Sequence, residues 1–123
     1  MLLTKRARHL RIHAGQVSFP GGKPEANDDS PAGTALREAE EETGLLPELV
    51  TIQGYLPPVL TNTNYMVDLT IGFCSQPVKE VGKLLRPAPE EVEDAWFQPA
   101  YPLVQLEQFE QHFLKLENDI LQP

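Results

Sequence analysis

The segment REAEEETGL, residues 37–45, places four glutamates within nine residues. On a helix, at about 100° per residue, Glu38, Glu41 and Glu42 share one face and Glu40 points away from it. Like charges three or four residues apart each destabilise a helix by about 0.2–0.5 kcal/mol. Glu41 and Glu42 also fall in the last helical turn, where the helix dipole disfavours anions by about 0.3–1 kcal/mol. The helix is therefore less stable unless a cation neutralises this face.

Two interpretations of the acidic face compete. A solvated helix face is the simpler one, but such a face normally mixes charges of both signs. Hard divalent cations take oxygen ligands, and Mg²⁺ uses one or two carboxylates together with substrate phosphates. We therefore interpret Glu38, Glu41 and Glu42 as ligands of a divalent metal ion.

The limits of this helix can be predicted from its flanking residues. Ser30 suits the N-cap and Pro31 the first helical position. The helix is expected to run to about Thr43, with Gly44 in the left-handed position that follows. Upstream, residues 16–19 form a short extended run that stops at the Pro-Gly-Gly sequence after Phe19.

Downstream of the helix, alternating apolar and polar residues predict strands at residues 50–56, 67–73 and 92–97. Pro57-Pro58 is expected to end the first of them. Strands on both sides of one central helix indicate an α/β or α+β sandwich.

Two further segments have weaker patterns. Several prolines and a glycine predict a long connecting loop at residues 75–90. A short helix is expected at residues 102–110. For residues 112–121 we favour a hairpin, with Asn118-Asp119 at its turn, over a continued helix.

Length and composition limit the class of protein. At 123 residues, the chain is predicted to be one domain, residues 1–123. The net charge of −8 argues against duplex nucleic acid as a partner. Cys74 is the only cysteine, so we expect a reducing, cytoplasmic location and a thiol packed as a small apolar group. No apolar run approaches the ~20 residues of a membrane span, and no signal peptide is recognised. Whether the chain forms a homo-oligomer stays open.

Charge is unevenly distributed along the chain. Residues 1–23 contain five cationic residues and no acid, and all eighteen carboxylates follow them. This division predicts an anion-binding segment before a cation-binding remainder, although a solvated basic edge strand is an alternative. The five cations are Lys5, Arg6, Arg8, Arg11 and Lys23.

The acidic helix also carries a family resemblance. Arg37-Glu38-Ala39-x-Glu41-Glu42-x-Gly44-Leu45 resembles the latter half of the Nudix box, a highly specific pattern. The box begins with a glycine and an acid further upstream, and Gly22 and Asp29 fill those places with one extra residue between them. The resemblance implies a Nudix fold, with a mixed β-sheet sandwiched between helices.

The preceding segment narrows the resemblance. LLTKRARHLRIHAGQVSFPGG, residues 2–22, is similar throughout to the signature that precedes the box in coenzyme A pyrophosphatases. The resemblance is strong over residues 2–45 and continues more weakly to about Phe97. Because the family normally has a strand before this signature, we interpret the chain as an N-terminally truncated form.

The resemblance implies a reaction and a cofactor. The family hydrolyses a diphosphate linked to another group, with Mg²⁺ or Mn²⁺. From coenzyme A the expected products are 4′-phosphopantetheine and adenosine 3′,5′-bisphosphate. A diphosphate resists attack because its oxygens are negative, so the site must neutralise it and activate a water molecule. Metal ions held by Glu38, Glu41 and Glu42 would do both.

Box residues and their neighbours receive supporting roles. Arg37 is expected to orient one of the box glutamates rather than bind the substrate. Gly21 and Gly22 are expected to let the backbone come close to the metal and phosphates, where a side chain would intrude. The general base is either a box glutamate or a loop acid, Glu90 or Glu91.

The substrate phosphates need cations beyond the metal. Arg6 and Arg11 are the best candidates, since guanidinium groups match phosphate oxygens. Two other functions stay open. A Nudix enzyme could act on another small molecule, such as a nucleoside diphosphate sugar or a dinucleotide. The chain could also be a non-catalytic nucleotide-binding domain or an inert fragment.

Overall fold

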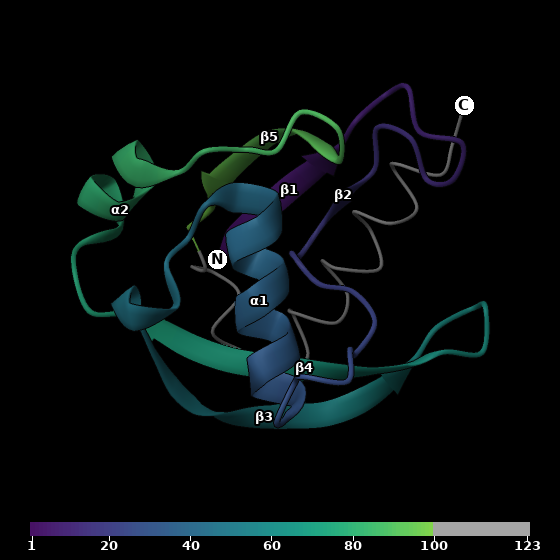
Figure 1. Ribbon diagram of the computed structural model, residues 1–123, viewed down its shortest axis with the longest axis horizontal. Helices are drawn as coiled ribbons and strands as arrows, with labels where there is room; N and C mark the ends of the chain where they lie inside the picture. The colour runs from purple at the N-terminus through teal and green to yellow at the C-terminus, as the bar shows by residue number, and fades with distance from the viewer. Residues whose placement is uncertain (100–123) are drawn as a thin grey trace.

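The structure is a computed structural model that describes residues 1–99 as two small sheets with one long helix, α1, between them (Figure 1). Helix α1 (Pro31–Thr43) contacts strands of both sheets. One sheet has the strand order β2 (Val17–Ser18), β1 (Leu2–Arg6), β5 (Val92–Phe97), and the other pairs β3 (Val50–Leu60) with β4 (Met66–Cys74).

This arrangement confirms the α+β class. Within residues 1–99 the strand pairs are antiparallel and belong to two sheets, whereas the sequence predicted one mixed sheet. The strands predicted at 67–73 and 92–97 are confirmed as β4 and β5. The extended run predicted at 16–19 is shorter, as β2. The helix and hairpin predicted at 102–110 and 112–121 lie outside the described residues.

Helix α1 begins and ends where the sequence predicted. The Ser30 Oγ accepts a hydrogen bond from the Gly33 N–H at 3.0 Å, and Pro31 opens the helix. Gly44 follows with φ of 76°, and its N–H donates to the Glu40 carbonyl at 2.8 Å. This left-handed position suits glycine, which has no β-carbon to clash.

Strand β1 is the middle strand of its sheet, whereas the sequence analysis considered a strand in this basic segment only as a solvated edge strand, the alternative to an anion-binding segment. Its Leu3 lies opposite Trp96 of β5, and its Lys5 lies opposite Val17 of β2. Leu3 and Thr4 are buried. The charged residues of this segment obscured the pattern, because Lys5 and Arg6 follow the buried pair directly.

The predicted loop at residues 75–90 is wrong in its first half, which contains helix α2 (Val78–Leu84). Pro77 precedes this helix and so does not interrupt it. Val81 on α2 is fully buried and joins the core. A helix of seven residues gives too few turns for its apolar spacing to stand out.

The predicted end of the first downstream strand is also wrong, because β3 continues through Pro57-Pro58 to Leu60. The pairing with β4 shifts register between Leu56 and Val59, so the two prolines fall at an irregularity. Proline lacks an N–H for a ladder bond and is tolerated at such a site.

The core lies where α1, α2 and the two sheets meet. Ala39 of α1 is buried there, together with Leu45, Val81 and Leu85. Side chains from both sheets pack against this cluster, among them Leu2, Val50, Cys74, Ala95 and Phe97. No helix among residues 1–99 is long and apolar enough to cross a membrane.

Candidate active site

The four glutamates of α1 differ in burial, which the helix numbering did not predict. Glu40 is exposed and Glu38 is partly buried. Glu42 is buried, with 7% of its surface accessible, and Glu41 lies at the exposed rim of the same face. Burial of a carboxylate is unusual unless a partner compensates for lost solvation.

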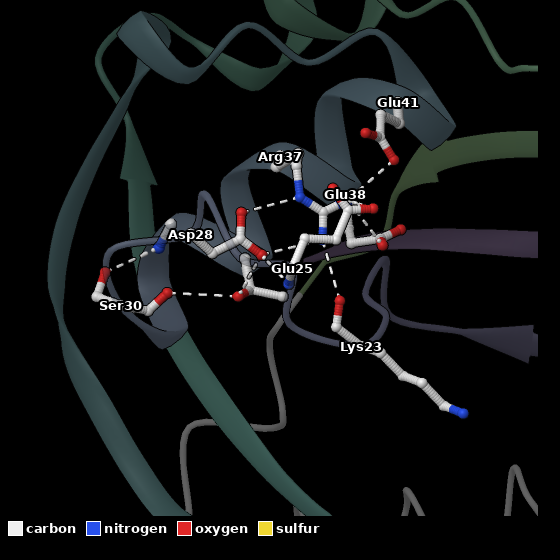
Figure 2. A network of polar contacts seen from close by, with 9 residues as sticks. Lys23, Glu25, Asp28, Ser30, Arg37, Glu38 and Glu41 are labelled. Atoms are coloured by element: carbon white, nitrogen blue, oxygen red, sulfur yellow. Dashed lines mark hydrogen bonds and ion pairs between the residues drawn. The ribbon is translucent and has the colours of Figure 1, made fainter.

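Arg37 is the centre of a polar network on this face (Figure 2). Its Nη1 donates to Oε1 of Glu38 and to Oε2 of Glu41, each at 3.1 Å. Its Nη2 donates to the Lys23 carbonyl at 3.0 Å, and Nη1 lies 3.4 Å from a carboxylate oxygen of Glu25. Arg37 therefore binds two of the three predicted metal ligands and links them to the loop before α1.

The strongest partner of Arg37 is Asp28. Nε and Nη2 of Arg37 donate to the two carboxylate oxygens of Asp28 at 3.0 and 3.1 Å, a bidentate pair. Asp28 also accepts from the Thr34 hydroxyl at 2.9 Å and from the Glu25 N–H at 2.8 Å. The hydrogen bonds from Arg37 hold the pKa of Asp28 well below its ordinary range, so this carboxylate stays ionised.

Asp28, and not Asp29, is thus the acid that pairs with Arg37, whereas the sequence analysis gave the upstream acid position of the box to Asp29. Asp29 is exposed. The signal was present in the sequence, since Asp28 is the sixth residue after Gly22. Asp29 lies one residue further from Gly22 than the box pattern has.

Gly21 and Gly22 contribute in different ways. The Gly21 N–H donates to Oε1 of Glu42 at 3.0 Å, and a β-carbon at Gly21 would contact nothing. A β-carbon at Gly22 would overlap the Glu38 carboxylate, at 2.6 Å from its Cδ. Of these two glycines, Gly22 is the one crowded by a described side chain, whereas Gly21 supplies a hydrogen-bond donor.

Glu42 is the most perturbed carboxylate of the face. Its pKa is raised from 4.5 to about 7, chiefly because burial disfavours the charged form. The hydrogen bond from Gly21 opposes this shift, while the negative charges of Glu38 and Glu91 add to it. Within residues 1–99 no cationic side chain forms an ion pair with Glu42. A buried anion without such a partner is a candidate cation ligand.

The end of α1 explains why Glu91 lies near Glu42. The Arg86 and Ala88 N–H groups donate to the carbonyls of Thr43 and Glu42, at 2.6 and 3.0 Å. These bonds satisfy carbonyls that the helix itself leaves unpaired. They also hold the segment before β5 against the acidic face, so that Glu91 is close enough to influence Glu42.

Glu90 and Glu91, the two predicted loop acids, are not equivalent. Both are exposed, but Glu91 is the one whose charge acts on Glu42. The Glu90 carbonyl lies 3.3 Å from Nε2 of His9, on the side of the loop after β1.

Arg6 and Arg11 lie in the segment at residues 6–11, which is hydrogen bonded to the loop that contains Glu90 and Glu91. Nε of Arg6 is buried and has no hydrogen-bond partner in the described part of the chain. Arg11 is exposed in the loop between β1 and β2. An open cavity of about 670 Å³ adjoins this region, lined by Ala7, Arg8, His9, Pro87, Pro89, Val92 and Glu93.

The three box carboxylates do not converge on one point in this arrangement. Across residues 1–99, no three His, Cys, Asp or Glu side chains meet closely enough to hold a metal ion. One oxygen of Glu38 and one of Glu41 are instead hydrogen bonded to Arg37. The donor chemistry still fits a hard divalent cation, because it consists of carboxylate oxygens around the unpaired anion Glu42.

These features define a Nudix-type domain, an α+β fold with its acidic box helix beside a glycine turn. The chain matches the NUDIX domain over residues 1–116 and belongs to that family.

Similar proteins support the family assignment. The chain is 51% identical over 73 residues to the uncharacterized Nudix hydrolase NudL of Enterobacter sp. (strain 638) and of Escherichia coli (strain K12). It is 53% identical over 73 residues to NudL of Shigella boydii serotype 4 (strain Sb227). Each match covers 59% of this chain and 38% of the relative, so the matched region is well under half of the relative's length.

A solved structure shares the fold. The chain superposes on a C. elegans Ap4A hydrolase binary complex with a TM-score of 0.63, over 95% of this chain and 81% of the other. At 15% sequence identity, this likeness concerns the fold alone.

Proposed function

We propose that this chain hydrolyses the diphosphate bond of coenzyme A or its derivatives, with Mg²⁺ or Mn²⁺ as cofactor. Water adds to one phosphorus, the bridging P–O bond breaks, and 4′-phosphopantetheine and adenosine 3′,5′-bisphosphate leave. Family membership supports the reaction class. The signature-like segment at residues 2–22 favours coenzyme A over other diphosphate-linked substrates.

One observation carries the proposal: Glu42 is a buried carboxylate beside Glu38 and Glu91, with no cationic side chain paired to it in the described residues. A cluster of this kind lowers the stability of the fold unless a cation compensates. A protein that retains it is expected to use it, because perturbed carboxylates concentrate at functional sites.

Glu38, Glu41 and Glu42 would hold the metal. When bound, Mg²⁺ or Mn²⁺ would neutralise the diphosphate oxygens and lower the pKa of a water molecule. The Gly21 N–H fixes the Glu42 carboxylate, and Arg37 positions Glu38 and Glu41 from the opposite side. Glu41 would supply a further carboxylate oxygen from its exposed position on the same face.

Glu91 is the favoured general base among the loop acids. It follows the turn that is hydrogen bonded to the end of α1, and its charge reaches Glu42. A base must lie within hydrogen-bond reach of the attacking water, and the exposed Glu91 side chain can meet a water beside the box carboxylates.

The nucleotide half of coenzyme A carries a 3′-phosphate and needs cations of its own. Arg6 offers a buried Nε that has no partner within residues 1–99, and Arg11 lies on the loop that follows. The open cavity beside residues 7–9 gives room for this half of the substrate.

The test is chromatographic detection of the two hydrolysis products from coenzyme A and from ADP-ribose, each with Mg²⁺, with Mn²⁺ and with chelator. We expect metal-dependent cleavage of coenzyme A at a higher kcat/KM than that of ADP-ribose. Preference for ADP-ribose would redirect the proposal to another diphosphate substrate. Nucleotide binding without turnover would identify a non-catalytic binding domain.

A further inference from the structure

Lys23 and Tyr65 form a pair at the edge of the candidate site that the proposed mechanism does not use. The Lys23 ammonium lies 5.5 Å from the centre of the Tyr65 ring. Lys23 is exposed, and within residues 1–99 its side chain has no acidic partner. Tyr65 is 58% exposed, in the turn between β3 and β4. A cation and an aromatic ring are thus presented together to solvent.

Neither side chain is needed to hold its own segment in place. The Lys23 backbone carbonyl, not its ammonium, accepts the bond from Arg37. Figure 2 shows the Lys23 side chain extending away from that network. The Tyr65 backbone closes the β3–β4 turn, with its carbonyl accepting from the Thr61 N–H at 2.8 Å and its N–H donating to the Thr61 Oγ1 at 3.2 Å. The backbones of both residues are therefore held by hydrogen bonds, while their side chains extend to solvent and contact each other.

Their position follows from the glycine turn. Lys23 directly follows Gly22, whose α-carbon borders the Glu38 carboxylate, so the pair begins beside the proposed diphosphate site. In Figure 1 the purple loop at residues 7–16 and the teal turn between β3 and β4 are well separated, with the blue segment 20–29 between them in this view. Arg11 belongs to the first of these places, Arg6 ends the strand just before it, and Tyr65 belongs to the second.

Charge distinguishes the two halves of the substrate. The nucleotide half carries two phosphate groups and matches the two arginines. The other half carries one phosphate on a mostly neutral arm with a branched apolar portion. One lysine and one aromatic ring match that half, because lysine meets a phosphate as a point charge and a tyrosine ring packs on apolar groups.

We propose that Lys23 and Tyr65 form the subsite for the 4′-phosphopantetheine half of the substrate. The Lys23 ammonium contacts its phosphate, and the Tyr65 ring covers the apolar portion of its arm. The inference rests on the proposed function for the identity of the substrate, but binding of the separate halves tests it without turnover.

The test is titration calorimetry of the full chain with 4′-phosphopantetheine and, separately, with adenosine 3′,5′-bisphosphate, both with Mg²⁺. Lys23→Gln should weaken binding of 4′-phosphopantetheine about 10- to 100-fold, as expected for a hydrogen bond to a charged group. Tyr65→Leu should weaken it about 2- to 10-fold, and Tyr65→Phe should leave it unchanged. Affinity for adenosine 3′,5′-bisphosphate should not change in any of these variants.

Matched controls separate a subsite from a general effect. Lys79→Gln removes an exposed lysine on α2, and Phe73→Leu removes an exposed aromatic ring at the other end of the β3–β4 hairpin. Neither should alter either affinity. The inference is overturned if the unaltered chain does not bind 4′-phosphopantetheine, or if the Lys23 and Tyr65 variants weaken both ligands equally. Selective loss of 4′-phosphopantetheine binding by a chain that hydrolyses nothing would uphold the subsite and reject the proposed reaction.

Discussion

Gly22 lies so close to Glu38 that a β-carbon at this position would come within 2.6 Å of the Glu38 Cδ. The Gly22→Ala substitution should therefore displace the Glu38 carboxylate and leave the backbone in place, since a side-chain tip can move. We expect turnover to fall by about 10- to 100-fold, because a misplacement of about 1 Å at a catalytic site can have this effect. Steady-state kinetics measure the loss of turnover, and a thermal melt checks that the backbone stays in place.

Gly21→Ala is the matched control for that substitution. A β-carbon there meets no atom within 4 Å, and the N–H that donates to Glu42 is retained. A smaller loss of turnover than in Gly22→Ala is expected, because Glu38 is not displaced. Equal losses in the two variants would show that crowding of Glu38 is not what matters at this turn.

Asp28 and Arg37 should stabilise the fold over a defined pH range. The pKa of Asp28 is lowered by the hydrogen bonds from Arg37, so the folded chain holds this proton less tightly than the unfolded chain. The stabilisation is then fully present above the ordinary aspartate pKa of 3.8 and is lost as pH falls through the lower, folded-state value.

The measurement compares melting of the unaltered chain and Asp28→Asn from pH 3 to pH 8. The variant should melt lower at pH 6, and the gap should shrink only below about pH 4. Asp29→Asn, at an exposed position, is the control and should track the unaltered chain. A larger effect at Asp29 than at Asp28 would restore the upstream acid position to Asp29.

The sequence predicted the parts of this site that depend on local physics. Ser30, Pro31 and Gly44 act within one turn of the helix ends, so their effect can be read without knowing the fold. The face shared by Glu38 and Glu42 follows from helical geometry alone.

The parts that were missed depend on contacts between distant segments. The bonds from Arg86 and Ala88 that place Glu91 near Glu42 join residues more than forty positions apart in the sequence. No local sequence pattern predicts these hydrogen bonds. Strand β1 likewise becomes recognisable only when β2 and β5 lie on either side of it.

Glu42 should make the metal-free fold less stable as pH rises. Its folded pKa of about 7 exceeds the ordinary value of 4.5, so between these values the folded chain binds more protons than the unfolded chain. Stability therefore falls through this window, by about 1–3 kcal/mol in total. With chelator present, Glu42→Gln should match the unaltered chain near pH 4 and exceed its stability at pH 8. No gain at pH 8 would show that the buried charge is compensated in some other way.

Divalent metal should make the unaltered chain more stable than Glu42→Gln. A ligand that binds only the folded chain stabilises it by about 2.7 kcal/mol at a hundredfold excess over Kd. Saturating Mg²⁺ or Mn²⁺ should raise the melting temperature of the unaltered chain and of Glu40→Gln, whose side chain is exposed on the other side of α1. The shift should be much smaller in Glu42→Gln. An unchanged melting temperature in the unaltered chain would count against a metal site on this face.

The catalytic roles predict a pattern across five substitutions. Glu38→Gln, Glu41→Gln and Glu42→Gln should each lower kcat far more than they raise KM, because a metal ligand acts mainly in the transition state. Glu91→Gln should lower kcat by about 10²- to 10⁴-fold if it is the general base, whereas Glu90→Gln should have little effect. Near-normal kcat in Glu91→Gln would assign the base to a box glutamate.

The substrate proposal predicts that the two arginines distinguish coenzyme A from 3′-dephospho-coenzyme A. Arg6 has a buried Nε without a hydrogen-bond partner within residues 1–99, which leaves this donor for a phosphate. Arg11 is exposed on a loop and must become ordered on binding. Because a hydrogen bond to a charged group is worth about 1.5–3 kcal/mol, Arg6→Ala should lower kcat/KM for coenzyme A about 10- to 100-fold, with a smaller loss for Arg11→Ala. Both losses should be much smaller with the substrate that lacks the 3′-phosphate. Equal losses on the two substrates would mean that these arginines serve the diphosphate or the fold, and recognition of the 3′-phosphate would then belong to other residues.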